Sequence, residues 1–140
     1  MNARVKLRLM RDMIKKHEGW RSKPYEDTEG ILTIGYGFNI AQGISREEGD
    51  AILDIRLKNV LVSTVSLEEF KHLDDIRQIV IVNMIYNLGL EGVKKFKRMW
   101  KAIGNKDYKS AAVEMLDSKW AVQVGRRAEE LSDIMRTGEL

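Results

Sequence analysis

The chain has 140 residues, a formal net charge of +3 and a hydrophobic content of 44%. This length predicts a single domain, with enough apolar residues to bury a core. The absence of cysteine excludes disulfides and thiolate chemistry. The mild positive charge suits a polyanionic partner such as cell wall, nucleic acid or anionic lipid, and it suits ordinary solubility equally well.

The first predicted helix spans residues 3–17, where apolar side chains recur at helical spacing between lysines and arginines. Gly19 is placed to end it. The basic N-terminus has no continuous apolar run, so we expect neither a signal peptide nor a membrane anchor. A hairpin is predicted next, with a short strand at 24–26, a turn at 27–30 and a β-branched return strand at 31–36.

The rest of the chain is predicted to be helical. Ser45 and the glutamate three residues later form a capping box for a helix that runs to about residue 62. A helix from Asp74 or Asp75 to Leu88 is apolar nearly all round, which predicts a central, buried element, although its β-branched run would also suit a strand. Further helices are expected at about 92–103, 107–117 and 119–136.

Two carboxylates flank the predicted hairpin. Glu18 stands just before Gly19, where the negative end of the helix dipole disfavours the ionised form, so we expect it to act as an acid. Asp27 opens the polar turn and is expected to stay ionised. Glycoside hydrolysis usually needs one protonated and one ionised carboxyl group. By spacing alone, two solvated surface groups are the commoner explanation, because the chain has 21 acidic residues.

The residues around these carboxylates form a more specific pattern. It reads Glu18-Gly19, then Tyr25-Glu26-Asp27-Thr28-Glu29-Gly30, then Thr33-Ile34-Gly35-Tyr36-Gly37. This pattern resembles the active-site stretch of the phage-type lysozymes, the endolysin muramidases of glycoside hydrolase family 24, and the resemblance continues over nearly the whole chain.

The resemblance implies an α+β, mostly helical fold with two lobes around a cleft, in a single domain over 1–140. The small lobe would carry the hairpin at about 15–60. The helical lobe would comprise about 61–140 together with the N-terminal helix.

The resemblance also assigns the catalytic roles. Glu18 would protonate the leaving sugar oxygen. Asp27 would stabilise positive charge at the anomeric carbon and orient or activate a water molecule. Thr33 would hold that water, since a hydroxyl group can both donate and accept a hydrogen bond.

Three further residues match positions that bind substrate or support the site. Asn39 and Tyr86 match positions that line the sugar cleft, and Arg127 matches an arginine that pairs with the catalytic glutamate. Tyr86 would equally suit a core aromatic with its hydroxyl at the surface, and Arg127 would suit a solvated helix residue. The chain also departs from the family, because Glu114 replaces a cleft asparagine and Met99 a cleft serine.

The function implied by the resemblance is hydrolysis of the β-1,4 bond between N-acetylmuramic acid and N-acetylglucosamine in bacterial peptidoglycan, leading to host cell lysis. We expect a monomer without metal or cofactor, held in the host bacterial cytoplasm until a holin opens its route to the wall. We expect no nucleic-acid partner and no membrane insertion.

Two other functions stay open. One is a catalytically inactive peptidoglycan-binding module on the same scaffold. The other is a nucleic-acid binder that uses the basic run at 94–101, although such a run is more typical of the wet face of an amphipathic helix.

Overall fold

The computed structural model describes all residues from 1 to 140 and divides them into two compact units. We call residues 1–50 the N-terminal unit and residues 51–140 the C-terminal unit. Helix α2 (Arg46–Ser63) contains the boundary between them. None of the helices has the length and apolar character that crossing a membrane requires.

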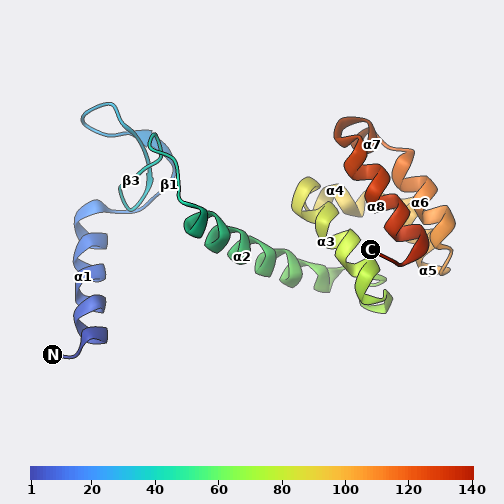
Figure 1. Cartoon of the computed structure of the whole chain (residues 1–140), viewed down its shortest axis with the longest axis horizontal. Coiled ribbons are helices and arrows are strands. Elements are labelled where there is room, and N and C mark those ends of the chain that lie inside the picture. Colours follow the sequence, from blue (N-terminus) through green and yellow to red (C-terminus); the bar gives the residue numbers. More distant parts are fainter. The chain divides into compact units, whose positions relative to one another are not determined.

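The N-terminal unit contains one helix and a small sheet (Figure 1). Helix α1 (Ala3–Glu18) is followed by strands β1 (Arg21–Glu26), β2 (Leu32–Gly35) and β3 (Phe38–Asn39). The strands form an antiparallel sheet in the order β1-β2-β3. The predicted helix and hairpin are therefore confirmed, and the short third strand is an addition that the sequence did not indicate.

Local signals explain where α1 begins and ends and where α2 begins. The Asn2 side chain accepts a hydrogen bond from the Val5 N–H at 2.9 Å, and Gly19 ends α1 with a φ of +69°. The predicted capping box of α2 is present, because the Ser45 N–H donates to Glu48 Oε1 at 2.9 Å and the Glu48 N–H donates to Ser45 Oγ at 3.1 Å. The hydrogen bonds that the backbone and the side chain of Ser45 make with the Glu48 carboxylate lower the pKa of Glu48.

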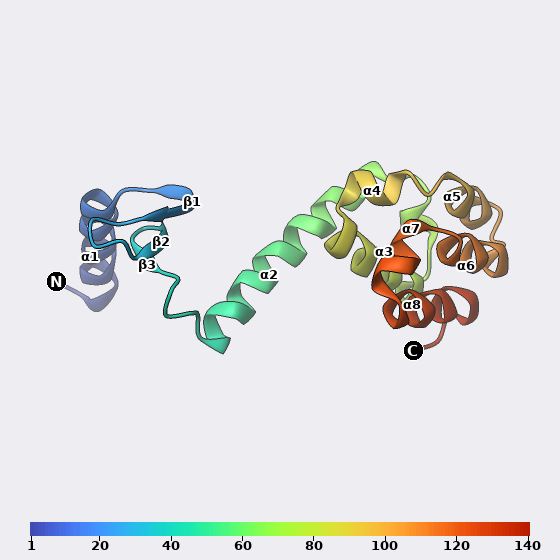
Figure 2. The same ribbon diagram turned by 90° about the horizontal axis from the view of Figure 1, so that it is seen from above.

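The C-terminal unit is a cluster of helices (Figure 2). Beyond α2 it contains η1 (Thr64–Ser66), η2 (Phe70–His72), α3 (Asp75–Leu88), α4 (Leu90–Lys94), α5 (Lys97–Gly104), α6 (Tyr108–Leu116), α7 (Lys119–Val124) and α8 (Arg126–Thr137). Helix α6 packs against α5 and α8, and α3 packs against α4 and α8. All the fully buried apolar side chains of this unit form one continuous core.

The predicted central helix is confirmed as α3. Its buried residues include Val80, Ile81 and Met84, which the structure leaves 0% exposed. The opposite face is open, because Ile79 and Tyr86 are 49% and 44% exposed. The helix is therefore buried along one side rather than all round.

Two predicted helices are each broken into two. The helix expected at 92–103 is interrupted before Phe96, whose ψ of +59° is not helical, and the Trp100 indole N–H donates to the Val93 carbonyl at the end of the first piece. The helix expected at 119–136 breaks at Gly125, whose φ of +57° and ψ of −116° favour glycine. The overall architecture is the expected α+β, mostly helical one.

Candidate functional site

Glu18 is the last residue of α1, and its carboxyl group lies against the backbone of Gly37 in the turn between β2 and β3. A Cβ atom at position 37 would lie 2.8 Å from Glu18 Cδ and would clash with Oε2. The φ of Gly37, +71°, is also one that side chains disfavour. Glycine at position 37 therefore allows the close approach of this carboxyl group to the hairpin.

Asp27 is held by the backbone of its own turn. Its Oδ1 accepts hydrogen bonds from the N–H groups of Glu29 at 2.8 Å and Ile31 at 2.9 Å. The Gly30 N–H donates to the Asp27 carbonyl at 3.0 Å, and the Asp27 N–H donates to the Ile31 carbonyl at 2.9 Å. Both side-chain bonds end on Oδ1, which fixes the carboxylate, and Oδ2 accepts no hydrogen bond from the protein.

Thr33 lies in the central strand and is buried, with 4% of its surface exposed. Its register partners are Tyr25 on β1 and Asn39 on β3. The Thr33 hydroxyl donates to the Ile31 carbonyl at 2.8 Å, so its remaining capacity is to accept a hydrogen bond. The sheet thus places Thr33 and Asn39, two of the predicted site residues, side by side.

Glu18 and Asp27 are associated with opposite ends of β2. The Asp27 turn hydrogen-bonds to Ile31 just before the strand, and Glu18 contacts the turn that follows Gly35. The four residue steps from Ile31 to Gly35 span about 13 Å at the usual rise of a strand. The two carboxyl groups are therefore held by different turns of the same three-stranded sheet.

An aromatic cluster, formed by Trp20, Tyr36 and Phe38, packs beside this turn. The Trp20 and Tyr36 ring centroids are 4.9 Å apart, and those of Tyr36 and Phe38 are 6.3 Å apart. A Cβ atom at Gly35 would lie 2.7 Å from the Phe38 ring. This cluster was not predicted from the sequence, although three aromatic residues around two glycines are a signal for close packing.

Tyr86 and Arg127 both line a cavity of about 560 Å³ in the C-terminal unit. Tyr86 is not a core aromatic, because 44% of its surface is exposed. Arg127 is not freely solvated, because its Nε donates to Asn83 Oδ1 at 2.9 Å. Asn83 was not assigned a role from the sequence, although a polar residue within the apolar run of α3 was a signal for one.

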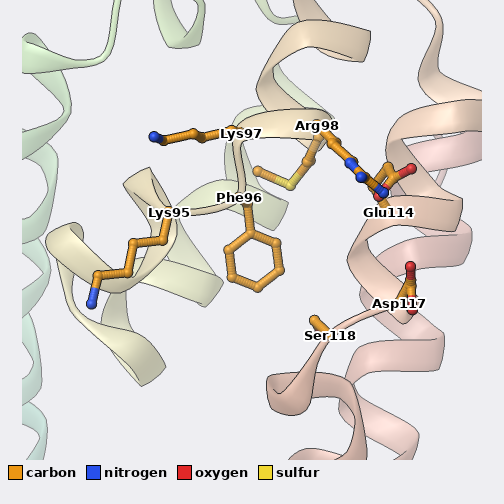
Figure 3. Close-up of a pocket in the computed structure, with 8 residues that line it drawn as sticks. Lys95, Phe96, Lys97, Arg98, Glu114, Asp117 and Ser118 are labelled. Atoms are coloured by element: carbon orange, nitrogen blue, oxygen red, sulfur yellow. The ribbon is translucent and has the colours of Figure 1, made fainter.

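A second cavity, of about 390 Å³, is lined by two positions where the chain departs from the family, Met99 and Glu114. Figure 3 shows Arg98 extending from the start of α5 toward Glu114, and Phe96 projecting into the space beside them. Neither Arg98 nor Glu114 takes part in any of the four ion pairs of the structure. Glu114 therefore adds a charged side chain, and Met99 an apolar one, to the lining of this cavity.

The donor groups present do not form a metal site. No group of three or more His, Cys, Asp or Glu side chains lies close enough together to hold a metal ion.

The chain is similar in sequence to several known proteins. The phage lysozyme family model matches residues 15–136. The chain is 30% identical to a probable T4-type lysozyme of Dictyostelium discoideum, an alignment that covers 94% of this chain and 95% of that protein. It is 29% identical to an endolysin of Acyrthosiphon pisum secondary endosymbiont phage 1, over 78% of this chain and 75% of the relative. It is also 27% identical to the pre-baseplate central spike protein Gp5 of Enterobacteria phage T4, over 94% of this chain and 28% of that protein.

Proposed function

The chain belongs to the phage lysozyme family, and from this premise we propose that it is a muramidase. Its reaction would be hydrolysis of the β-1,4 linkage between N-acetylmuramic acid and N-acetylglucosamine in bacterial peptidoglycan. Family membership supports a lysozyme-like enzyme of the glycosidase type. The observation that carries the finer proposal is the pair of carboxyl groups held by two turns of one small sheet, Glu18 against Gly37 and Asp27 through Oδ1.

Each residue has a separate chemical task in this reaction. Glu18, in its protonated form, gives its proton to the glycosidic oxygen as the bond to the anomeric carbon breaks. Asp27, as the anion, stabilises the positive charge that develops on the sugar and accepts the proton of the attacking water. Thr33 accepts a hydrogen bond from that water, because its own hydroxyl proton is donated to the Ile31 carbonyl.

We propose that the product is inverted at the anomeric carbon. In retaining enzymes the two carboxyl groups are only about 5 Å apart, whereas inverting enzymes leave room for a water molecule between carboxylate and sugar. The Thr33 hydroxyl, which is free to accept a hydrogen bond from an attacking water molecule, supports this direct displacement by water. Proton NMR of the first sugar anomer released from a soluble glycan tests this, and release of the β-anomer would contradict it.

We also propose roles for the remaining site residues. Asn39 adjoins Thr33 across the sheet and would contact the sugar bound there. Tyr86 and Arg127 would bind substrate from the wall of their cavity, where Asn83 holds the guanidinium group of Arg127 in place.

We propose host cell lysis as the biological outcome, with the protein acting as a monomer. It would remain in the host bacterial cytoplasm until a holin lets it reach the wall. The likeness to a protein named as an endolysin supports this setting.

The decisive experiment compares the wild-type protein with Glu18→Gln on purified peptidoglycan. The amide has nearly the same shape but no acidic proton, so we expect hydrolysis to fall by about 10²- to 10⁴-fold. Glu47→Gln is the matched control, because Glu47 is exposed in the first turn of α2 and lies outside the site.

Reducing-end release from the glycan is the measurement. Equal release by wild type and Glu18→Gln would refute the acid role of Glu18. If the wild-type protein bound the wall without releasing reducing ends, the chain would instead be an inactive peptidoglycan-binding module.

A further inference from the structure

Lys15 lies next to two carboxylates of its own helix but forms an ion pair with neither. It follows Asp12 by three residues and precedes Glu18 by three. Residues at this spacing are neighbours on the surface of a helix. The four ion pairs of the structure all join residues at this spacing, and none of them contains Lys15, Asp12 or Glu18. Spacing alone therefore does not determine where the Lys15 ammonium group lies.

The Lys15 ammonium group lies over an aromatic ring instead. Its Nζ atom is 5.2 Å from the ring centroid of Tyr36, which stands between Gly35 and Gly37 in the turn from β2 to β3. A cation at this distance is attracted by the face of the ring. At exposed sites the attraction is about as strong as an ion pair between neighbouring residues of a helix. The ring can therefore compete with the two carboxylates for Lys15.

Other aromatic residues hold the Tyr36 ring in place. The Trp20 ring lies 4.9 Å from it at an interplanar angle of 53°, and the Phe38 ring meets it nearly edge-on at 6.3 Å. Tyr36 is half-buried by these contacts. The Glu18 carboxyl group lies against Gly37 in the same turn. One turn of the N-terminal unit thus holds both the carboxyl group of Glu18 and the ring that binds Lys15.

The other charged groups around Glu18 do not pair with it in its unit. Arg21 follows Glu18 by three residues, and its guanidinium carbon lies 4.2 Å from the ring centroid of Tyr25. The cations on either side of Glu18 in the chain are therefore each placed over a tyrosine ring. The remaining charged or titratable groups on the last turns of α1, and the arginine that the resemblance pairs with this glutamate, are the same in every variant described below: Asp12, Lys16, His17 and Arg127.

We propose that Tyr36 is a positioning residue for the general acid, because its ring holds Lys15 away from Glu18. The inference rests on the proposed acid role of Glu18. An ion pair with Lys15 would stabilise the anionic carboxylate, whereas the reaction needs the protonated form to give its proton to the glycosidic oxygen. By binding the ammonium group, Tyr36 lets Glu18 keep its proton to a higher pH.

Carboxyl-carbon NMR of the full-length protein tests this proposal by measuring the pH at which Glu18 is half-protonated. Tyr36→Leu removes the ring and should lower this midpoint by about 0.4 pH unit, the effect of one exposed ion pair on a helix. The double variant Tyr36→Leu/Lys15→Gln should have the same midpoint as Lys15→Gln alone, because without Lys15 the ring has no cation to hold. Tyr36→Phe keeps the ring and should leave the midpoint unchanged.

Two further variants make the test specific. Lys15→Gln alone should raise the midpoint by only about 0.2 pH unit, the effect of a nearby but unpaired charge, and it needs no change in the turn. Tyr108→Leu is the matched control, because Tyr108 also lies under a cation, the guanidinium group of Arg77, at 3.7 Å. Arg77 keeps its hydrogen bonds to Asp74 and to the Met135 carbonyl, so the Glu18 midpoint should not move. Circular dichroism checks that each variant is folded.

The pH dependence of kcat/KM on a soluble glycan should follow the same pattern. Hydrolysis falls on the alkaline side as the acid loses its proton, so Tyr36→Leu should move this limb down by about 0.4 pH unit and lower the rate there about 2.5-fold. A purely structural role of Tyr36 would lower kcat without moving the limb.

Three results would overturn the proposal. They are an unchanged Glu18 midpoint in folded Tyr36→Leu, a shift in that variant that persists when Lys15 is also removed, or a rise of about 0.5 pH unit in Lys15→Gln alone. The last result would mean that Lys15 already pairs with Glu18 in the wild type, and it decides the question even if Tyr36→Leu does not fold. The NMR titration needs no hydrolysis, so its outcome is distinct from that of the Glu18→Gln experiment.

Discussion

The N-terminal and C-terminal units are built in different ways. All 19 buried hydrophobic residues, from Leu67 to Met135, belong to the C-terminal unit. The N-terminal unit buries the side chain of Thr33 and the backbone of Gly35. Yet the three proposed catalytic residues, Glu18, Asp27 and Thr33, all lie in the N-terminal unit.

The difference shows that the candidate site depends on backbone geometry more than on core packing. Five of the eight glycines with positive φ lie in the N-terminal unit. Its carboxyl groups are held by turns and close backbone contacts, whereas α3 in the C-terminal unit is held by packing around Met84. We therefore expect substitutions in the two units to affect different properties.

The largest expected effect is on the stability of the C-terminal unit. Met84 is 0% exposed, so Met84→Ala should lower the free energy of unfolding by about 3 kcal/mol through lost burial and a cavity. Val122→Ala, at a position that is 85% exposed, should change it by less than about 0.5 kcal/mol. Urea unfolding measures both, and equal losses would contradict the assigned core.

Gly37→Ala should reduce activity strongly. The new Cβ atom would displace the Glu18 carboxyl group, and a misplacement of this kind costs about 10²-fold in rate. Gly43→Ala is the matched control, because its φ is also positive, +80°, but its Cβ would meet nothing within 4 Å. Both variants should lose about 1 kcal/mol of stability, and only the first should lose hydrolysis. Similar activities of Gly37→Ala and Gly43→Ala would contradict the proposal that Gly37 supports catalysis by allowing the close approach of Glu18.

Thr33→Val should lower kcat by about tenfold, the value of one hydrogen bond to the attacking water. The stability loss should stay below about 1 kcal/mol, because the Ile31 carbonyl still accepts from the Asp27 N–H at 2.9 Å. Thr33→Ser should restore most of the rate. Full activity of Thr33→Val would contradict the proposed role of the Thr33 hydroxyl in binding the attacking water.

The smallest effect concerns the cap of α3. The Asp74 carboxylate accepts from the Arg77 N–H at 3.0 Å and from its guanidinium at 2.8 Å, so Asp74→Ala should cost about 1 kcal/mol at neutral pH. Burial opposes ionisation of Asp74, but its bonds with Arg77 prevail and lower its pKa.

The lowered pKa of Asp74 gives the pH dependence of this effect. Its stabilisation is fully present above the unfolded-state pKa of about 3.9 and is lost as pH falls through the lower folded value. Urea unfolding of wild type and Asp74→Ala should therefore converge in acid. A difference that persisted unchanged at low pH would contradict the role of the ionised carboxylate.

Several structural elements could be predicted from the sequence, because they depend on interactions between residues that are close together in the chain. The span of α1, the hairpin and the capping box of Ser45 follow from periodicity, turn composition and cap chemistry. The break between α7 and α8 could also have been predicted, because Gly125 is a glycine within the helical stretch. Nothing in the composition near Phe96 indicates the break between α4 and α5.

Local sequence patterns account for the type and order of the main elements, and for the motif that contains Glu18, Asp27 and Thr33. Three contacts arise only in the folded chain: Glu18 against Gly37, Thr33 beside Asn39, and Asn83 with Arg127. The reason is physical. Helix periods and caps depend on near neighbours in the chain, whereas these contacts join residues that only the register of strands and the packing of helices bring together.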